Sequence, residues 1–337
     1  MKLTATESKM RILKALATFD RAAGATQIGA VLRRWGVNLG ERSIRLYLTQ
    51  LDSEGMTTLQ SRRTGRVVTA KGKAELSSGD VLGRMAFISG QIDELNYRMG
   101  FSVKVGKGTL VVNATHLPAE RLEKALDIAR PVFEARLGMG TRIIVQKGGE
   151  SCDSAGKMPV PRGKAAIVTV CSVTLNGILL KEGIPVTSRY GGLMEYRNQI
   201  PVRFVELLEY GGTTQDPLEL FIRSKMTSVL KCARTGDGLV GASFREFPSV
   251  ALAKVIKIRD RLKQVGLDGI VAVGAPDQPL FGIPVGEGRT GLVVHAGLNP
   301  VAALEESGIE NMSRSLAGLI EYGQFHEFNE IRMPATS

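Results

Sequence analysis

The 337-residue chain is poor in the residues that build metal and redox sites. Its three cysteines, Cys152, Cys171 and Cys232, form no CxxC pair, and its three histidines are equally scattered. Neither set has the spacing of a disulfide framework or a zinc site. The sequence also shows no carboxylate cluster of the kind that holds catalytic metals, and no clear nucleophile or acid–base constellation. We therefore expect no metal, no cofactor and no enzymatic activity.

Long apolar runs are absent as well. No stretch approaches the roughly 20 apolar residues that cross a bilayer. The first residues, MKLTATESKMRILKAL, lack the short apolar core and small-residue cleavage site of a signal peptide. We expect a cytoplasmic protein without a membrane partner.

Charge is unevenly distributed along the chain, whose formal net charge is +11. Residues 1–75 contain 14 Lys/Arg and 6 Asp/Glu, whereas the remainder contains 30 and 27. A compact basic module joined to a near-neutral body indicates a polyanion-binding head on a different kind of domain. We place the two domains at 1–76 and 80–330, with a short boundary near Ser77-Ser78-Gly79-Asp80.

The basic head has three helical patterns followed by a hairpin pattern. Apolar residues recur at helical spacing within 7–19, 25–36 and 41–55. Thr26 is available as a cap for the second helix, and Gly55 fits the end of the third. Short β-prone runs then flank Thr64-Gly65. Three helices and a hairpin in this order predict a winged helix-turn-helix, whose third helix enters the major groove of DNA.

Polar side chains that lie off the apolar stripe of the third helix could reach base edges or phosphates. Further arginines surround the tip of the expected wing and suit phosphate or minor-groove contact. The alternative is a three-helix domain with an incidentally basic surface. The predicted DNA-binding residues are Arg42, Ser43, Arg45, Thr49, Gln50, Arg62, Arg63 and Arg66.

The body contains a weak internal repeat. Residues 158–184 align with 283–309 at an offset of 125, and residues 117–128 align with 247–258 at an offset of 130. Each copy is interpreted as helix, strand, Gly loop, strand and helix. We therefore expect a mixed α/β (α+β) domain made of two weakly similar halves, with a ligand cleft between them.

Equivalent positions of the two copies suggest an anion site. Lys164 and Arg289 coincide at the offset of 125, one on each Gly loop. Asn299-Pro300 resembles a helix cap and first helical position, and Thr174 takes the matching place in the first copy. Free N–H groups at helix starts attract carboxylates or phosphates. An acidic small molecule would suit these features, although each is also compatible with a purely structural role.

The segment between the copies offers further candidates. Arg189 and Arg203 could clamp a carboxylate, and Asp216-Pro217 looks like the start of another helix. Cys171 has no neighbouring His motif and is interpreted as a buried small hydrophobe rather than a nucleophile. GEGRTG at 286–291 has the spacing of the dinucleotide-binding motif GxGxxG. That motif must open a helix, whereas here a β-like run follows, so we do not interpret it as a dinucleotide site. The predicted effector-binding residues are Lys164, Cys171, Thr174, Arg189, Arg203, Arg289 and Asn299.

Several long motifs go beyond general patterns. ERSIRLYLTQLDSEGM with RRTGRVVTAKG resembles the winged-helix domain of the NrpR family of nitrogen-regulation repressors. VPRGKAAIVTVCSVTLNGILLKEGIPVTSRYGGLMEY, DPLELFI, ASFREFP and GLNPVAALEESGI are similar to motifs of the family's effector domain. The resemblance runs from about residue 8 to about residue 325. Gly40 stands where the family commonly has Ser, and glycine is an acceptable N-cap.

The resemblance implies a homodimeric transcriptional repressor of nitrogen-assimilation genes. It also implies binding to inverted-repeat operators in double-stranded DNA, and release by the dicarboxylate 2-oxoglutarate. Some members carry two effector domains, whereas this chain carries one, so the dimer geometry and the effector can differ. The alternatives are a winged-helix regulator that answers a different metabolite, an enzyme acting on a small organic acid with a DNA-binding head, and a non-specific DNA-packaging protein.

Overall fold

The computed structural model describes residues 4–19, 21–61, 63–79, 81–148 and 160–331, and of residues 77–79 and 81–87 the backbone alone. The chain divides into two compact units, Met1–Gly83 and Arg84–Ser337. We call the first unit the head and the second the body, and each is described by itself.

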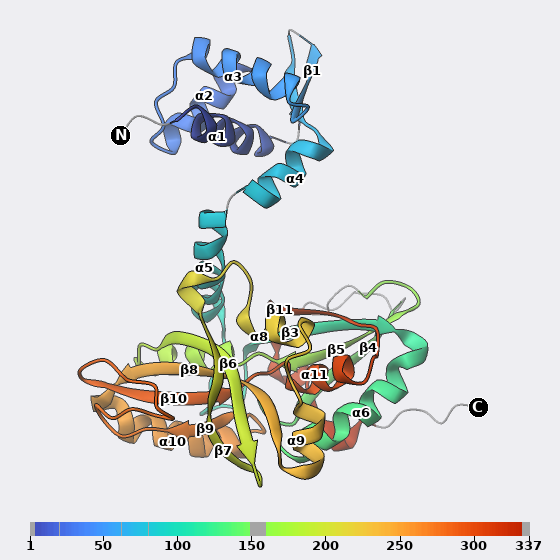
Figure 1. Cartoon of the computed structure of the whole chain (residues 1–337), viewed down its shortest axis with the longest axis vertical. Helices are drawn as coiled ribbons and strands as arrows, with labels where there is room; N and C mark the ends of the chain where they lie inside the picture. The colour runs from blue at the N-terminus through green and yellow to red at the C-terminus, as the bar shows by residue number, and fades with distance from the viewer. Residues whose placement is uncertain (1–3, 20, 62, 80, 149–159, 332–337) are drawn as a thin grey trace. The chain divides into compact units, whose positions relative to one another are not determined.

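The head consists of three helices, a β-hairpin wing and a fourth helix that follows the wing (Figure 1). Its core is formed by the predicted apolar stripes, with Leu13, Ile28 and Leu48 almost fully buried. Trp35, which belongs to the apolar pattern of residues 25–36, is however 44% exposed. The elements are α1 (Ala5–Ala17), α2 (Ala25–Arg34), α3 (Glu41–Ser53), β1 (Thr57–Ser61), β2 (Gly65–Val68) and α4 (Ala70–Gly79).

The helix boundaries of the head follow their local signals with one exception. Gly40 is the N-cap of α3, and Gly55 follows its C-terminus with a φ of +73°. The expectation that Thr26 caps α2 is wrong, because Gly24 is the N-cap. Thr26 lies inside the first turn, where its hydroxyl donates a hydrogen bond to Glu41 at the start of α3 (2.9 Å).

The body repeats one sequence of elements, which confirms the predicted internal repeat. The first copy runs β3, η1, α6, β4, β5, α7, and the second runs β8, η3, α10, β9, β10, α11. The first copy comprises β3 (Thr109–Pro118), η1 (Ala119–Arg121), α6 (Leu122–Glu134), β4 (Arg142–Lys147), β5 (Lys164–Val170) and α7 (Val173–Lys181). The second comprises β8 (Gly238–Pro248), η3 (Ser249–Ala251), α10 (Leu252–Gln264), β9 (Ile270–Val273), β10 (Arg289–His295) and α11 (Asn299–Glu306).

The remaining elements precede, join or follow the copies. They are α5 (Val81–Arg98), β6 (Thr187–Arg197), β7 (Ile200–Glu209), α8 (Pro217–Arg223), α9 (Val229–Thr235), β11 (Met312–Glu321), β12 (His326–Glu327), and the short turns η2 (Tyr210–Gly212), η4 (Tyr322–Gln324) and η5 (Phe328–Glu330). Among the described residues, no helix is long and apolar enough to cross a membrane.

The two copies exchange strands. The antiparallel sheets have the orders β7-β6-β8-β10-β9 and β11-β3-β5-β4-β12 (Figure 1). β6 leaves the first copy after α7 and pairs with β8 of the second, whereas β11 leaves the second copy after α11 and pairs with β3 of the first. Each sheet is therefore completed by a strand that follows the other copy. Because the exchange is reciprocal, we infer that the two halves fold together.

Candidate functional site

The exposed side of α3 presents the predicted reading residues together. Arg42, Ser43, Arg45 and Thr49 line one shallow hollow on its surface, along with Leu46. Ile44, Leu48 and Leu51 on the opposite side are buried in the head. The polar residues therefore stand on a helix that the core holds firmly. Gln50, one position beyond the hollow, is half-buried.

The apolar stripe of α3 did not predict two properties of its exposed side chains. Leu46 is 58% exposed, and an exposed aliphatic side chain among hydrogen-bonding groups suits contact with a thymine methyl group. Arg45 pairs with Glu41 one turn earlier at 2.9 Å, with the Arg45 side chain 69% exposed. Such an exposed pair adds little to folding stability, so the guanidinium can exchange this partner for another anion at small cost.

The wing arginines differ in their surroundings. Arg63 is exposed at the hairpin turn. Arg66 is largely covered, because its Nε lies 2.7 Å from a carboxylate oxygen of Asp52 on α3. The Arg66–Asp52 ion pair therefore braces the wing against the helix that carries the reading residues. Arg62, the third predicted wing residue, lies outside the described residues.

The turn of the wing packs closely on the segment before α2, and this packing gives a first prediction. Gly65 has a φ of +101°, and a Cβ there would lie 2.2 Å from the carbonyl oxygen of Ala23. We expect Gly65→Ala to lower the free energy of unfolding of the head by about 2 kcal/mol or more, because backbone must move. Urea unfolding followed by the fluorescence of Trp35, the chain's single tryptophan, measures this.

Gly36→Ala is the matched control. Gly36 also has a positive φ, +73°, but a Cβ there meets nothing within 4 Å. The Gly36→Ala substitution should lower the free energy of unfolding by only about 1 kcal/mol, because it adds backbone strain alone. Equal losses for the two variants would show that the close approach of the wing is not a constraint.

In the body, the expected helix caps have other roles. Thr174 is fully buried inside α7, whose N-cap is Ser172, and its hydroxyl exchanges hydrogen bonds with the backbone of Val111 on β3 at 3.0 and 3.1 Å. The prediction that Thr174 occupies a cap position is therefore wrong. Its hydrogen-bonding groups already have protein partners.

The same correction applies to Asn299. It is the first residue of α11, and the N-cap is Leu298. The fully buried Asn299 amide donates to the carbonyl oxygens of Leu137 (2.6 Å) and Gly241 (2.9 Å). These bonds tie α11 to β8 and to the segment after α6, so the residue joins the two copies.

Two predicted carboxylate clamps already hold carboxylates. Arg189 on β6 forms an ion pair with Glu246 at 2.7 Å. Arg203 on β7 pairs with Glu195 at 2.8 Å. Hydrogen bonds from Arg197 and Arg203 lower the pKa of Glu195 below its usual value.

Lys164 and Arg289 do not converge on one site. Each begins a strand, Lys164 on β5 and Arg289 on β10, and the two strands belong to different sheets. Arg289 donates a weak hydrogen bond to Thr187 at 3.3 Å. The internal repeat explains this separation, because equivalent positions of two copies are related by symmetry and need not be adjacent.

Cys171 lies in the core, beside a residue that the sequence analysis missed. Burial raises the pKa of the Cys171 thiol to about 12, in keeping with a small hydrophobe rather than a nucleophile. Arg245 on β8 is also fully buried. Its guanidinium donates to Ser172 O (2.8 Å) and Oγ (2.9 Å), to Ser243 Oγ (3.1 Å) and to the Asn176 side chain.

No carboxylate forms an ion pair with Arg245 among the described residues, and its Nε has no hydrogen-bond partner there. The side chain links β8 of the second copy to the start of α7 in the first. A charged residue in the apolar run ASFREF was the available signal for it.

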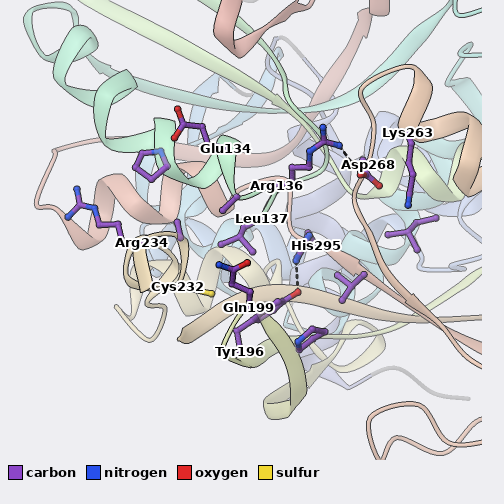
Figure 2. A pocket seen from close by; sticks show the side chains of 16 residues that line it. Glu134, Arg136, Leu137, Tyr196, Gln199, Cys232, Arg234, Lys263, Asp268 and His295 are labelled. Atoms are coloured by element: carbon purple, nitrogen blue, oxygen red, sulfur yellow. Dashed lines mark hydrogen bonds and ion pairs between the residues drawn. The ribbon is translucent and has the colours of Figure 1, made fainter. Parts of the chain in front are cut away.

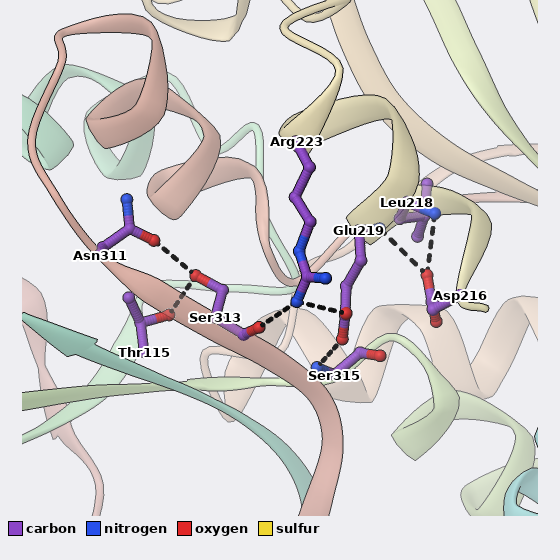
Figure 3. A network of polar contacts seen from close by, with 8 residues as sticks. All are labelled: Thr115, Asp216, Leu218, Glu219, Arg223, Asn311, Ser313 and Ser315. Atoms are coloured by element: carbon purple, nitrogen blue, oxygen red, sulfur yellow. Dashed lines mark hydrogen bonds and ion pairs between the residues drawn. The ribbon is translucent and has the colours of Figure 1, made fainter. Parts of the chain in front are cut away.

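A second polar network anchors α8 against β11 (Figure 3). As predicted, Asp216 caps α8, accepting from the backbone N–H of Leu218 at 2.8 Å. Burial raises the pKa of Asp216 to about 6. One turn on, Glu219 accepts from the backbone N–H of Ser315 and lies 3.4 Å from Arg223.

A pocket of about 670 Å³ opens between elements of the two copies (Figure 2). At its floor, Tyr196 Oη and His295 Nε2 are 2.8 Å apart. Burial lowers the pKa of His295 to about 4, so the imidazole is neutral at pH 7. Arg136 and Asp268 form an ion pair across 3.2 Å. None of the seven predicted effector residues lines this pocket.

The described residues contain no group of three or more His, Cys, Asp or Glu side chains that could hold a metal ion. The site candidates are thus two: the exposed face of α3 in the head, and the pocket of the body. The first has the chemistry of nucleic-acid contact, and the second has the size of a small-molecule site.

Comparison with known proteins places both units in a family. Residues 85–327 match the NrpR regulatory domains NRD1 and 2, and residues 10–76 match the ribonuclease R winged-helix domain. The chain is 32% identical over 318 residues to the global nitrogen regulator NrpRI of Methanosarcina mazei, covering 94% of this chain and 97% of that protein. It is 28% identical over 299 residues to the global nitrogen regulator NrpR of Methanococcus maripaludis, covering 89% of this chain and 51% of that protein.

A crystal structure of a nitrogen repressor-like protein from Methanococcus jannaschii has the same fold over 71% of this chain and 97% of that chain. Its TM-score is 0.59 at 24% sequence identity. Both relatives named above are global nitrogen regulators. The regulatory-domain match over most of the body and the full-length similarity to NrpRI together show that this chain belongs to the NrpR family.

Proposed function

We propose that the protein is a transcriptional repressor of nitrogen-assimilation genes that binds double-stranded DNA through its head. The observation that carries the proposal is the hollow on α3, where Arg42, Ser43, Arg45 and Thr49 are exposed side by side. Arginine, serine and threonine are common donors to base edges and phosphates in the major groove. Arg63 extends the basic surface to the wing.

The proposal includes a homodimer and a small dicarboxylate effector. A helix-turn-helix protein reads an inverted repeat when two recognition helices meet successive major grooves about 34 Å apart. An effector that binds one arrangement of the dimer better than another would change this spacing and release the DNA. By resemblance to the family, the effector is 2-oxoglutarate.

Fluorescence anisotropy of labelled duplexes tests the DNA-reading role. The duplexes would tile the gene's own upstream region and a glutamine-synthetase promoter, with a scrambled duplex for comparison, at fixed salt. We expect Arg45→Ala to weaken specific binding by about fivefold or more, because an arginine contact with a base edge is worth about 1–3 kcal/mol. The head should stay folded, since the Arg45–Glu41 pair is exposed.

Arg121→Ala is the matched control, because it removes the same charge from an exposed position on η1 of the body. It should leave binding unchanged. Equal binding of the promoter and scrambled duplexes, or equal losses in the two variants, would contradict sequence reading by α3. Addition of millimolar 2-oxoglutarate to the native complex then tests the effector, which should lower the anisotropy.

A further inference from the structure

Strand β7 lies at the edge of its sheet and exposes a row of apolar side chains. It comes first in the order β7-β6-β8-β10-β9 and forms a long hairpin with β6 (Figure 1). None of its ten residues is buried. Ile200, Val202, Val205 and Leu207 are 64%, 39%, 37% and 38% exposed. By contrast, the edge strand β9 has no exposed residue, and the edge strand β11 has three buried ones. Exposed apolar residues along a strand edge are typical of a surface that another chain covers.

The internal repeat does not require β7. Strand β6 follows the first copy and β11 follows the second, and each pairs with the first strand of the other copy. Strand β6 then turns back into β7, whereas β11 ends at η4 and remains first in the order of its sheet. β7 is therefore an addition to one half of the body, and its exposed apolar side chains complete neither copy.

The charges on β7 are not balanced within the chain. Arg203 shares the carboxylate of Glu195 with Arg197, and each guanidinium lies 2.8 Å from it. Two cations on one carboxylate leave one positive charge in excess. Glu206 is exposed and forms no ion pair among the described residues. β7 thus presents an excess cation and an unpaired anion three residues apart.

A two-fold axis through the middle of β7 would pair both charges at once. The axis passes between Phe204 and Val205 and sets the second strand antiparallel to the first. Arg203 then faces Glu206 of the partner subunit, and Glu206 faces the partner's Arg203. A shift of one residue in either direction sets both charges against apolar side chains. Because opposite charges fix register at an interface, the sequence of β7 is complementary to itself in a single contact that closes as a dimer.

Two bulges in β7 determine the kind of contact. Val202 and Val205 have no partner on β6, because the register of the hairpin shifts at each of them. A bulge bends the strand and interrupts its ladder, so the outer edge does not offer a continuous row of backbone groups to another strand. Both valines nevertheless stay exposed. The contact that fits this surface is therefore made by side chains.

We propose that β7 is the dimer interface of the body, where it packs antiparallel against β7 of a second copy of this chain. Exposed apolar side chains form the centre of the contact, and two Arg203–Glu206 pairs flank it. The proposal rests on the homodimer of the proposed function and names the surface that forms it. Because each body carries one head, a dimer joined in this way presents two recognition helices.

Charge reversal on the full chain tests the interface, with the dissociation constant of the dimer measured by analytical ultracentrifugation. Arg203→Glu and Glu206→Arg should each raise this constant about a hundredfold or more. Each substitution enters the symmetric contact twice and turns both pairs into like-charge contacts. An equimolar mixture of the two variants should dimerise as the native chain does, because both pairs across the axis are then again opposite in charge.

Arg197→Glu is the matched control for charge. It reverses the other arginine that Glu195 holds, but on β6, one strand away from the contact. It should dimerise as the native chain does. Val205→Lys should dissociate the dimer, because lysine is a residue that natural strand edges use against pairing. Val250→Lys is its control, since Val250 is 97% exposed on η3 and lies outside β7. Thermal unfolding confirms that each variant is folded.

Three results would overturn the proposal: a native chain that is monomeric, charge variants that dimerise as the native chain does, or a mixture of them that stays monomeric. Anisotropy with the promoter duplexes, on the same samples, keeps this failure apart from that of the proposed function. Dimeric charge variants would remove the interface and leave the homodimer. A monomeric native chain that still prefers the promoter to the scrambled duplex would remove both and leave the reading of DNA by α3.

Discussion

Arg245→Ala is expected to lower the free energy of unfolding of the body by about 3 kcal/mol or more. The guanidinium is fully buried and serves four oxygen acceptors on Ser172, Asn176 and Ser243. Hydrogen bonds to a charged donor are worth about 1.5–3 kcal/mol each, and acceptors left without a donor in the core add to the loss. The alanine would also leave a cavity where β8 meets α7.

Urea unfolding followed by far-ultraviolet circular dichroism measures this loss. Trp35 fluorescence in the same samples reports the head, whose transition should not move. Arg245→Met serves as the packing control, because it fills much of the space with apolar atoms. If the hydrogen bonds matter most, methionine should recover less than half of the loss; full recovery would show that the network is dispensable and that volume alone holds the halves together.

The head could be predicted almost completely because its signals are local. Each helix carries its own apolar stripe, and α3 has its stop at Gly55 within the same short segment. The wing was visible from Thr64-Gly65 between two β-prone runs. The error at Thr26 has the same origin: a hydroxyl near a helix start is a good cap, but here Glu41, fifteen residues away, takes its hydrogen bond.

In the body, the contacts between residues far apart in the sequence could not be predicted. The order of elements in each copy follows from the repeat. The exchange of β6 and β11 does not, because strand pairing across more than forty residues leaves no mark on either strand alone. The same applies to Thr174 and Asn299, whose partners lie 63 and up to 162 residues away.

The pocket was missed for a related reason. Tyr196 and His295 are 99 residues apart and belong to no common motif. The candidates that the sequence did offer were charged residues at equivalent positions of the repeat, and the fold distributes them over two sheets. A lone histidine at the end of the strand pattern LVVH was the available clue, and its burial became apparent only with the fold.

Acidification should change the contributions of two buried groups, Asp216 and His295, to the free energy of unfolding in opposite directions. Burial raises the pKa of Asp216 from 3.8 to about 6, so the native state binds the proton more tightly than the unfolded chain. The contribution of Asp216 to stability therefore falls as the pH rises from about 4 to 6 and stays low at pH 7. At 1.36 kcal/mol per pKa unit the full effect is about 3 kcal/mol.

His295 behaves in the opposite way. Burial lowers its pKa from 6.5 to about 4, so the unfolded chain binds the proton more tightly. The contribution of His295 to the free energy of unfolding is complete above pH 6.5 and is lost as the pH falls toward 4. The loss is again about 3 kcal/mol. The contributions of Asp216 and His295 nearly cancel in the native protein between pH 4 and 6.5. A free energy of unfolding that stays constant over this pH range would therefore conceal both.

Two variants separate them. Asp216→Asn retains a capping side chain and should raise the free energy of unfolding at pH 7 by up to about 3 kcal/mol; relative to the native protein, this gain should shrink as the pH falls to 4. His295→Gln should show the reverse slope, gaining relative to the native protein on acidification. The other titratable groups are the same in all three proteins, so the differences between urea-unfolding curves at pH 7, 5.5 and 4 isolate the two groups. Parallel profiles would mean that water reaches both side chains, and that the floor of the pocket is wetter than its burial indicates.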